Sequence, residues 1–165
     1  MASRMFFDPI VGLRALPLVS STCTLLFGWD QTFFLGLINR PETRQASKPM
    51  LPSYFASFFR AGAPFVVSLI AVSFWSGIAN LFVRRSVLES RASWSWYLAG
   101  TVSALGHLLY VPWVAPPIQD IIEAKEGADL NKRLDSWIRI NTIRTLTVDL
   151  AAWVSFVIAV GKTLE

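Results

Sequence analysis

The chain has 165 residues, of which 53% are hydrophobic and only 16% charged, against about 25% charged residues in an average soluble domain. With a mean hydropathy of +0.47, this composition excludes an ordinary soluble enzyme and a disordered tail. The net charge of +4 comes without a basic stripe interleaved with aromatic residues, so a nucleic-acid-binding protein is excluded as well.

Four apolar stretches are long enough to cross a bilayer as helices, since about 20 residues at 1.5 Å rise each span the hydrocarbon core. In chain order they cover residues 16–38, 61–83, 94–115 and 141–160. Backbone amides in lipid must form hydrogen bonds within their own segment, and these stretches lack alternating polarity, which favours helices over strands. We therefore predict one all-α domain over residues 1–165, a four-helix transmembrane bundle whose surroundings are the lipid bilayer.

The first stretch is predicted to remain as a membrane span. Arg4 and Arg14 precede it, as basic residues precede a secretory signal. However, its length of about 23 residues exceeds the 7–15 of a secretory core, and an A-x-A-like cleavage site is missing. The expected location is an endomembrane, the endoplasmic reticulum.

The connections between spans carry signals of their own. Residues 40–60 open with three prolines and end in an aromatic run suited to the headgroup level, which predicts a surface segment that partly re-enters the membrane. Residues 118–140 interleave apolar and charged side chains. This pattern predicts an interfacial amphipathic segment between the third and fourth helices, interrupted at Gly127.

Each predicted helix carries one polar stripe. The cost of an unpartnered polar group in lipid directs such stripes toward the bundle interior, and small residues at four-residue spacing, as at Gly28 and Thr32, favour close helix packing there. The stripes contain Asp30 in the first helix, Asn80 in the second, His107 and Tyr110 in the third, and Trp137, Asn141, Arg144 and Asp149 in the fourth. The alternative interpretation is structural: hydrogen bonds that hold the helices together, with Asp30 and Arg144 as an ion pair.

The same residues suit proton transfer in a dry pocket. An imidazole titrates near neutral pH, so His107 is the predicted base, with Asp30 as its orienter or substitute. Arg144 and Asn141 would hold a developing oxyanion, and Tyr110 would donate a hydrogen bond. The predicted substrate-binding residues, suited to a flat hydrophobic small molecule, are Trp29, Asn80, Trp113, Trp137 and Asp149.

Neither a metal site nor a cofactor site is expected. The sequence has one cysteine, Cys23, and one histidine, which form neither a disulfide nor a Cys/His cluster at a recognised spacing. A dinucleotide-binding loop is missing too.

The second half of the chain resembles a known family. Residues 110–119 read YVPWVAPPIQ, and a charged stretch then leads to W-x3-N-x2-R between Trp137 and Arg144. This arrangement, over roughly residues 100–160 together with the four-span layout, is similar to the small integral-membrane family typified by fungal anthrone oxygenases. The chain departs from the family pattern at Pro117 and Gln119.

The resemblance implies a membrane-embedded tailoring enzyme of polyketide-like secondary metabolism. Such a monooxygenase oxidises an anthrone-like carbon with O2 and without a cofactor. His107 would deprotonate the substrate, and Arg144 and Asn141 would hold the enolate.

Two other functional classes stay open. A cyclase or isomerase of a terpenoid-like substrate would use Asp30 or Asp149 as a protonating acid, without consuming oxygen. A non-catalytic membrane adaptor or transporter subunit would need the helix-packing glycines and none of the polar groups. Faces of small residues on the outside of the bundle would also allow two copies of the chain to pack together as a homo-oligomer.

Overall fold

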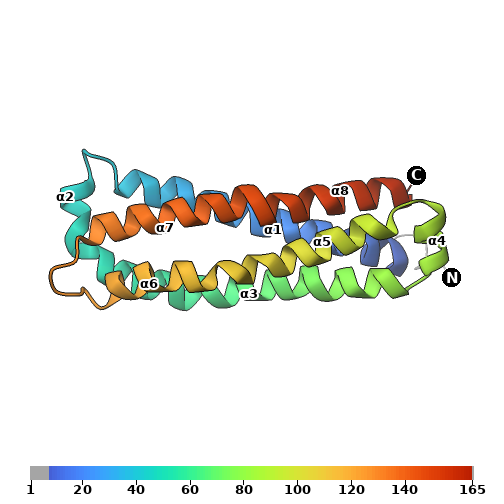
Figure 1. The fold of residues 1–165 in the computed structure, drawn as a ribbon, viewed down its shortest axis with the longest axis horizontal. Helices are drawn as coiled ribbons and strands as arrows, with labels where there is room; N and C mark the ends of the chain where they lie inside the picture. Colours follow the sequence, from blue (N-terminus) through green and yellow to red (C-terminus); the bar gives the residue numbers. More distant parts are fainter. Residues whose placement is uncertain (1–7, 165) are drawn as a thin grey trace.

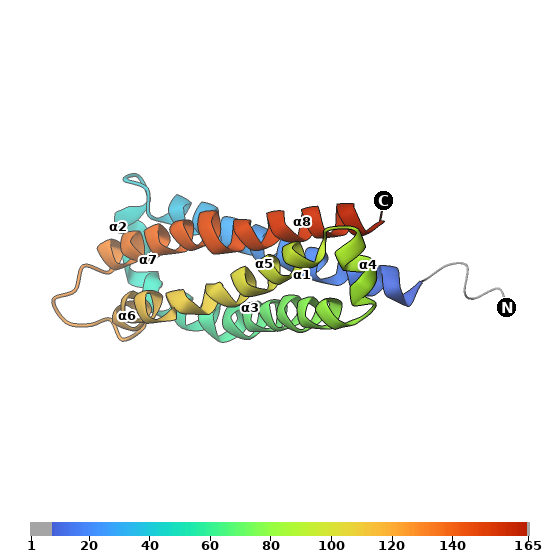
Figure 2. The same ribbon diagram turned by 45° about the vertical axis from the view of Figure 1, so that its right-hand side comes forward.

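The structure, a computed structural model, describes residues 8–164 and contains helices but no strand in that range. Among the described residues, four long helical stretches form rods that lie side by side and alternate in direction along the chain (Figures 1 and 2). The elements are α1 (Pro9–Ile38), α2 (Arg44–Ser47), η2 (Lys48–Met50), α3 (Leu51–Phe82), α4 (Arg85–Ser90), α5 (Trp94–Gly106), η3 (His107–Tyr110), α6 (Val111–Ile122), α7 (Leu130–Arg144), η4 (Thr145–Asp149) and α8 (Leu150–Leu164). The predicted all-α bundle is confirmed.

Four stretches of the structure are helical, long and apolar enough to cross a membrane, and each overlaps one predicted span. They are Pro9–Ile38, Arg44–Phe82, Trp94–Ile122 and Leu130–Leu164. The third rod consists of α5, η3 and α6, and the fourth of α7, η4 and α8. The protein is therefore a multi-pass membrane protein by the length and composition of its helices.

The predicted surface segment at residues 40–60 is wrong for its second half, which is the beginning of α3. Pro52 stands in the first turn of α3, where its missing N–H group has no hydrogen bond to lose, so this proline begins the helix rather than breaking it. Phe55, expected at the headgroup level, is fully buried, and its ring centroid lies 6.0 Å from that of Trp137.

The interruption predicted at Gly127 is present. Here the backbone turns with a φ of 74°, a conformation that glycine adopts without strain. The Asp129 side chain then caps α7 by accepting a hydrogen bond from the Lys132 backbone N–H. The helical parts on either side are the ends of two long rods, α6 and α7, rather than a separate segment.

Two apolar clusters occupy opposite ends of the bundle. The cluster at the α2 end contains Leu35, Leu51, Phe55, Ile121, Leu130, Leu134 and Trp137. The cluster at the α4 end contains Leu81, Leu88, Tyr97, Ala104, Ala152, Phe156 and Ala159. Between the two clusters, the third rod changes to η3 and the fourth to η4, and there His107 of η3 contacts Asp149 of η4.

Candidate functional site

The site lies where two rods depart from regular α-helical geometry. In the third rod, Pro112 cannot donate a backbone hydrogen bond and its ring crowds the carbonyl four residues earlier. The preceding residues, His107–Tyr110, accordingly form a tighter 3-10 turn. In the fourth rod, Thr145–Asp149 form a π-helical turn, a distortion that is frequent at functional sites. His107 and Asp149 stand on these two turns.

The π-helical turn places Arg144 and Asp149 on one face. In a regular α-helix, residues five apart point about 140° away from each other. The wider turn reduces this angle, and Arg144 Nε donates to Asp149 Oδ2 at 3.2 Å. The same carboxylate reaches across to the third rod, where its Oδ1 lies 2.8 Å from His107 Nδ1. One carboxylate thus joins an imidazole and a guanidinium.

All three side chains of this group are buried: 6% of His107, 7% of Arg144 and 3% of Asp149 is exposed. With the proton on Nδ1, His107 donates to the carboxylate, and its Nε2 keeps a lone pair for a proton. Asp149 and Arg144 balance each other in charge, which a low-dielectric interior requires. When His107 takes up a proton, the group gains one positive charge, which would stabilise an anion formed beside it.

Arg144 keeps most of its hydrogen-bonding capacity. A guanidinium has five N–H donors, of which the one on Nε binds Asp149. Among residues 8–164, Nη1 and Nη2 have no partner within hydrogen-bond distance. These two nitrogens are the free donors of the site.

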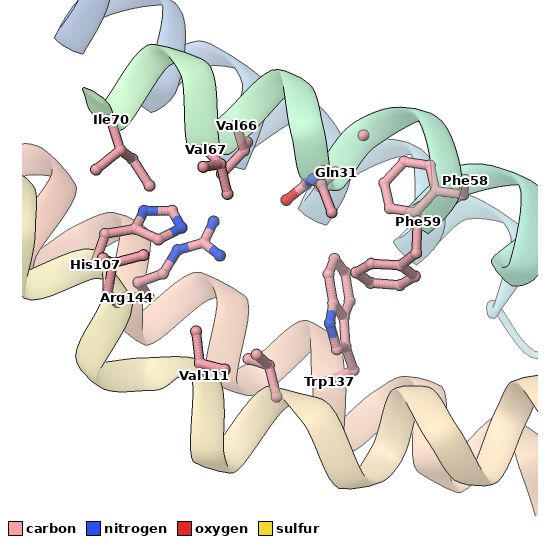
Figure 3. Close-up of a pocket in the computed structure, with 14 residues that line it drawn as sticks. Gln31, Phe58, Phe59, Val66, Val67, Ile70, His107, Val111, Trp137 and Arg144 are labelled. Carbon is pink, nitrogen blue, oxygen red and sulfur yellow. The ribbon is translucent and has the colours of Figure 1, made fainter. Parts of the chain in front are cut away.

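His107 and Arg144 border a cavity of about 140 Å³. Gln31 and Trp137 also line it, and the rest of its wall is apolar, from α3 (Phe58, Phe59, Gly62, Ala63, Val66, Val67, Ile70) and from the third rod (Leu108, Val111, Val114). Figure 3 shows His107, Arg144 and Gln31 pointing into this space, with the Trp137 ring forming one end. The cavity is an apolar chamber with a basic nitrogen and a cation in its wall.

The structure brings together four of the predicted site residues: His107, Arg144, Asp149 and Trp137. Asn141 lies beside them, yet its two Nδ2 hydrogens are used by the Gly28 carbonyl at 2.9 Å and by Thr32 Oγ1 at 2.8 Å. The predicted oxyanion role of Asn141 is wrong, because it has no donor left. Instead Asn141 holds α7 against α1 at Gly28.

Asp30 does not orient His107. Its side chain is exposed on the outer face of α1, and within the described part of the chain it forms no ion pair or hydrogen bond. Successive helical residues point about 100° apart, so the inward position belongs to Gln31. The inward face contains Thr24, Gly28, Gln31 and Leu35, all buried. This spacing of small and polar residues is the sequence signal that places Gln31 on the inward face.

Three predicted aromatic residues lie outside the cavity. Trp29 is 56% exposed and Trp113 is 61% exposed, on faces that would contact lipid. The Tyr110 hydroxyl is 3.0 Å from Thr147 Oγ1, and Tyr110 lines an outer groove with Trp113 instead of the chamber. The predicted hydrogen-bonding and substrate-binding roles of these residues are therefore wrong.

Asn80, another predicted substrate-binding residue, belongs to a separate network around buried Arg14. Asn80 Oδ1 accepts from Arg14 Nη1 at 2.7 Å, and Arg14 Nη2 donates to the Val83 carbonyl at 2.8 Å. These contacts pair both Nη nitrogens of the guanidinium and satisfy the carbonyl of Val83, the residue that caps α3. Asn80 does not line the cavity.

Replacing Asn80 with Ala is expected to destabilise the protein without impairing the site. The buried Arg14 loses its side-chain acceptor, at a cost of about 2–3 kcal/mol, which denaturation in mixed micelles measures. Turnover per folded molecule should stay at the wild-type value. A raised KM together with an unchanged free energy of unfolding would contradict this prediction and indicate that Asn80 binds the substrate.

Three fungal proteins are similar to this chain over most of its length. Epoxidase pydX of Acremonium sp is 30% identical over 156 residues, 94% of this chain and 96% of that protein. Probable epoxidase scpX of Mollisia scopiformis is 26% identical over 152 residues, 92% and 96% of the two chains. Epoxidase gkaX of Penicillium citrinum is 29% identical over 147 residues, 89% and 91% of the two chains.

No family model and no solved structure matches the chain. The similarity to pydX nevertheless covers 94% of this chain and 96% of that protein. The chain belongs to the family of small fungal proteins that includes the epoxidase pydX.

Proposed function

We propose that this protein is a membrane-embedded oxygenase of secondary metabolism that forms an epoxide on an apolar small molecule. The observation that carries the proposal is the buried His107–Asp149–Arg144 group at the wall of an apolar cavity. Membership in a family with named epoxidases supplies the reaction type. An endomembrane would supply the substrate, dissolved in lipid.

In this proposal His107 Nε2 accepts a proton from the substrate, and Asp149 holds the imidazole in the tautomer that leaves Nε2 free. Arg144 stabilises the substrate anion through its Nη donors. A preorganised cation in a water-poor site is effective because it needs no solvent rearrangement as charge develops. The apolar wall keeps water away from the anion.

The oxidation balances when the substrate itself is the electron donor. Reduction of one molecule of O2 takes four electrons, and the substrate supplies all of them. It gives two when one oxygen atom is inserted as the epoxide and two more when it loses two hydrogen atoms. The second oxygen atom leaves as water. The net change is a gain of one oxygen atom and a loss of two hydrogen atoms, with no external reductant.

The size of the cavity argues against a whole anthrone as the buried ligand. A cavity of about 150 Å³ holds a single benzene ring, and this one measures about 140 Å³. Only one ring of a three-ring anthrone would enter. The proposed reaction shares its deprotonation step with anthrone oxygenation. It differs in that only the reacting end of the substrate lies in the cavity.

Deleting the gene in its fungal host and comparing metabolites by mass spectrometry tests the reaction. The compound that accumulates should have one oxygen atom fewer and two hydrogen atoms more than the missing product. Membranes containing the protein should convert it under 18O2 into labelled epoxide without added nicotinamide cofactor. Equal elemental composition of the two compounds would instead indicate the cyclase or isomerase, and no accumulation would indicate the adaptor.

A further inference from the structure

The oxygen of one buried amide at the cavity has no hydrogen-bond partner among residues 8–164. Gln31 is 9% exposed, its Oε1 is buried without a hydrogen-bond partner, and its side chain forms no hydrogen bond within residues 8–164. An unpartnered amide away from water costs about 1–3 kcal/mol. A glutamine retained at this cost points to a ligand that pairs with it.

Gln31 and the free end of Arg144 border the same cavity. Figure 3 shows the Gln31 oxygen directed toward the middle of the chamber, where the Arg144 guanidinium also points. The amide offers an acceptor and donors, and the guanidinium offers donors alone. A group that satisfies both has a carbonyl oxygen for Arg144 and an adjacent N–H or O–H for the Gln31 oxygen.

The rest of such a ligand has to lie outside the chamber. About 140 Å³ holds one ring or a comparable head group. Beyond the chamber, the wall continues to apolar residues at the outer surface: Val67 on α3 is 56% exposed, and Leu108 and Val111 on the third rod are 41% and 49% exposed. At this depth such residues face hydrocarbon, so the opening between α3 and the third rod leads into the bilayer.

We propose that Gln31 and Arg144 together bind the polar end of the substrate, a carbonyl with a neighbouring N–H or O–H, while its apolar remainder extends between α3 and α6 into the lipid. The inference rests on the proposed function, for which it defines the substrate class. Gln31 is its specificity-determining residue.

Binding of two simple probes tests the role of Gln31. Dodecanamide has a carbonyl and N–H donors, and N,N-dimethyldodecanamide has the carbonyl without a donor. We expect the full-length protein in nanodiscs to bind dodecanamide at least about tenfold more tightly than the dimethyl compound, as one hydrogen bond predicts, with quenching of tryptophan fluorescence as the measurement. In Gln31→Leu this preference should disappear, with the affinity for the dimethyl compound unchanged.

Stability separates a binding residue from a structural one. Because Leu fills a similar volume and leaves no unpartnered amide, Gln31→Leu should unfold at the same or a higher temperature than the wild type. Gln119→Leu, which changes an exposed glutamine of α6, is the matched control and should keep the preference for dodecanamide. Equal affinity of the wild type for both probes, or a preference that survives in Gln31→Leu, would overturn the proposal.

The route is tested with a dodecanamide that bears a photoreactive diazirine in mid-chain. Its labels should map to the α3 and α6 residues around Val67 and Val111. Labels on α8 or α1 alone would contradict entry between α3 and α6. Both experiments measure binding without O2 or turnover, so they remain informative if the epoxidation itself fails its test.

Discussion

Replacing Asp149 with Asn is expected to lower kcat by at least about 100-fold. The asparagine amide can donate to His107 Nδ1, which moves the imidazole proton to Nε2 and removes the base. The corresponding change in a serine protease triad lowers kcat by about 10⁴-fold. Arg144 also loses its buried counter-ion, so the free energy of unfolding should fall by about 3–5 kcal/mol. Turnover of the accumulated precursor, normalised to folded protein, is the measurement.

Asp30→Asn is the matched control, since it makes the same chemical change at an exposed position of α1. Its activity and stability should equal those of the wild type. If Asp30→Asn lost activity and Asp149→Asn kept it, the carboxylate that orients His107 would have been misidentified.

His107→Ala is expected to lower kcat by about 10²–10⁴, the usual contribution of a general base. The substitution leaves space beside Asp149, so added imidazole should restore part of the activity. The restored rate should rise with pH through the imidazole titration near neutrality, because the neutral ring is the base. Oxygen uptake with and without imidazole measures both effects.

Tyr110→Phe is the control for His107→Ala. Its hydroxyl contacts Thr147 on the outer side of the rods, so turnover should change little. Full activity of His107→Ala without imidazole would remove His107 from the mechanism. A large loss of turnover in Tyr110→Phe would restore the role of hydrogen-bond donor predicted from the sequence.

The fold could be predicted from the sequence almost completely, because hydrocarbon leaves the backbone few choices. Four apolar stretches of sufficient length specify four helices. The error lies at a helix start: the sequence predicts a surface segment over residues 40–60, whereas Pro52 stands in the first turn of α3. Local composition at a helix start resembles that of a loop, and neighbouring helices decide between them, here through the burial of Phe55 against Trp137.

Within the site, the sequence alone identified His107, Arg144, Trp137 and Asp149 as buried polar or aromatic residues, since ionisable groups at this depth must face the protein interior. The partner of each residue was decided by the tertiary structure. Asp30 and Gln31 differ by one helical step. The spacing of small residues favours Gln31 on the inward face, and packing of α1 against α7 fixes it there, through the hydrogen bond from Asn141 to the Gly28 carbonyl. Asp149 reaches both Arg144 and His107 because the fourth rod widens into a π-helical turn, and regular helical periodicity does not reveal that turn.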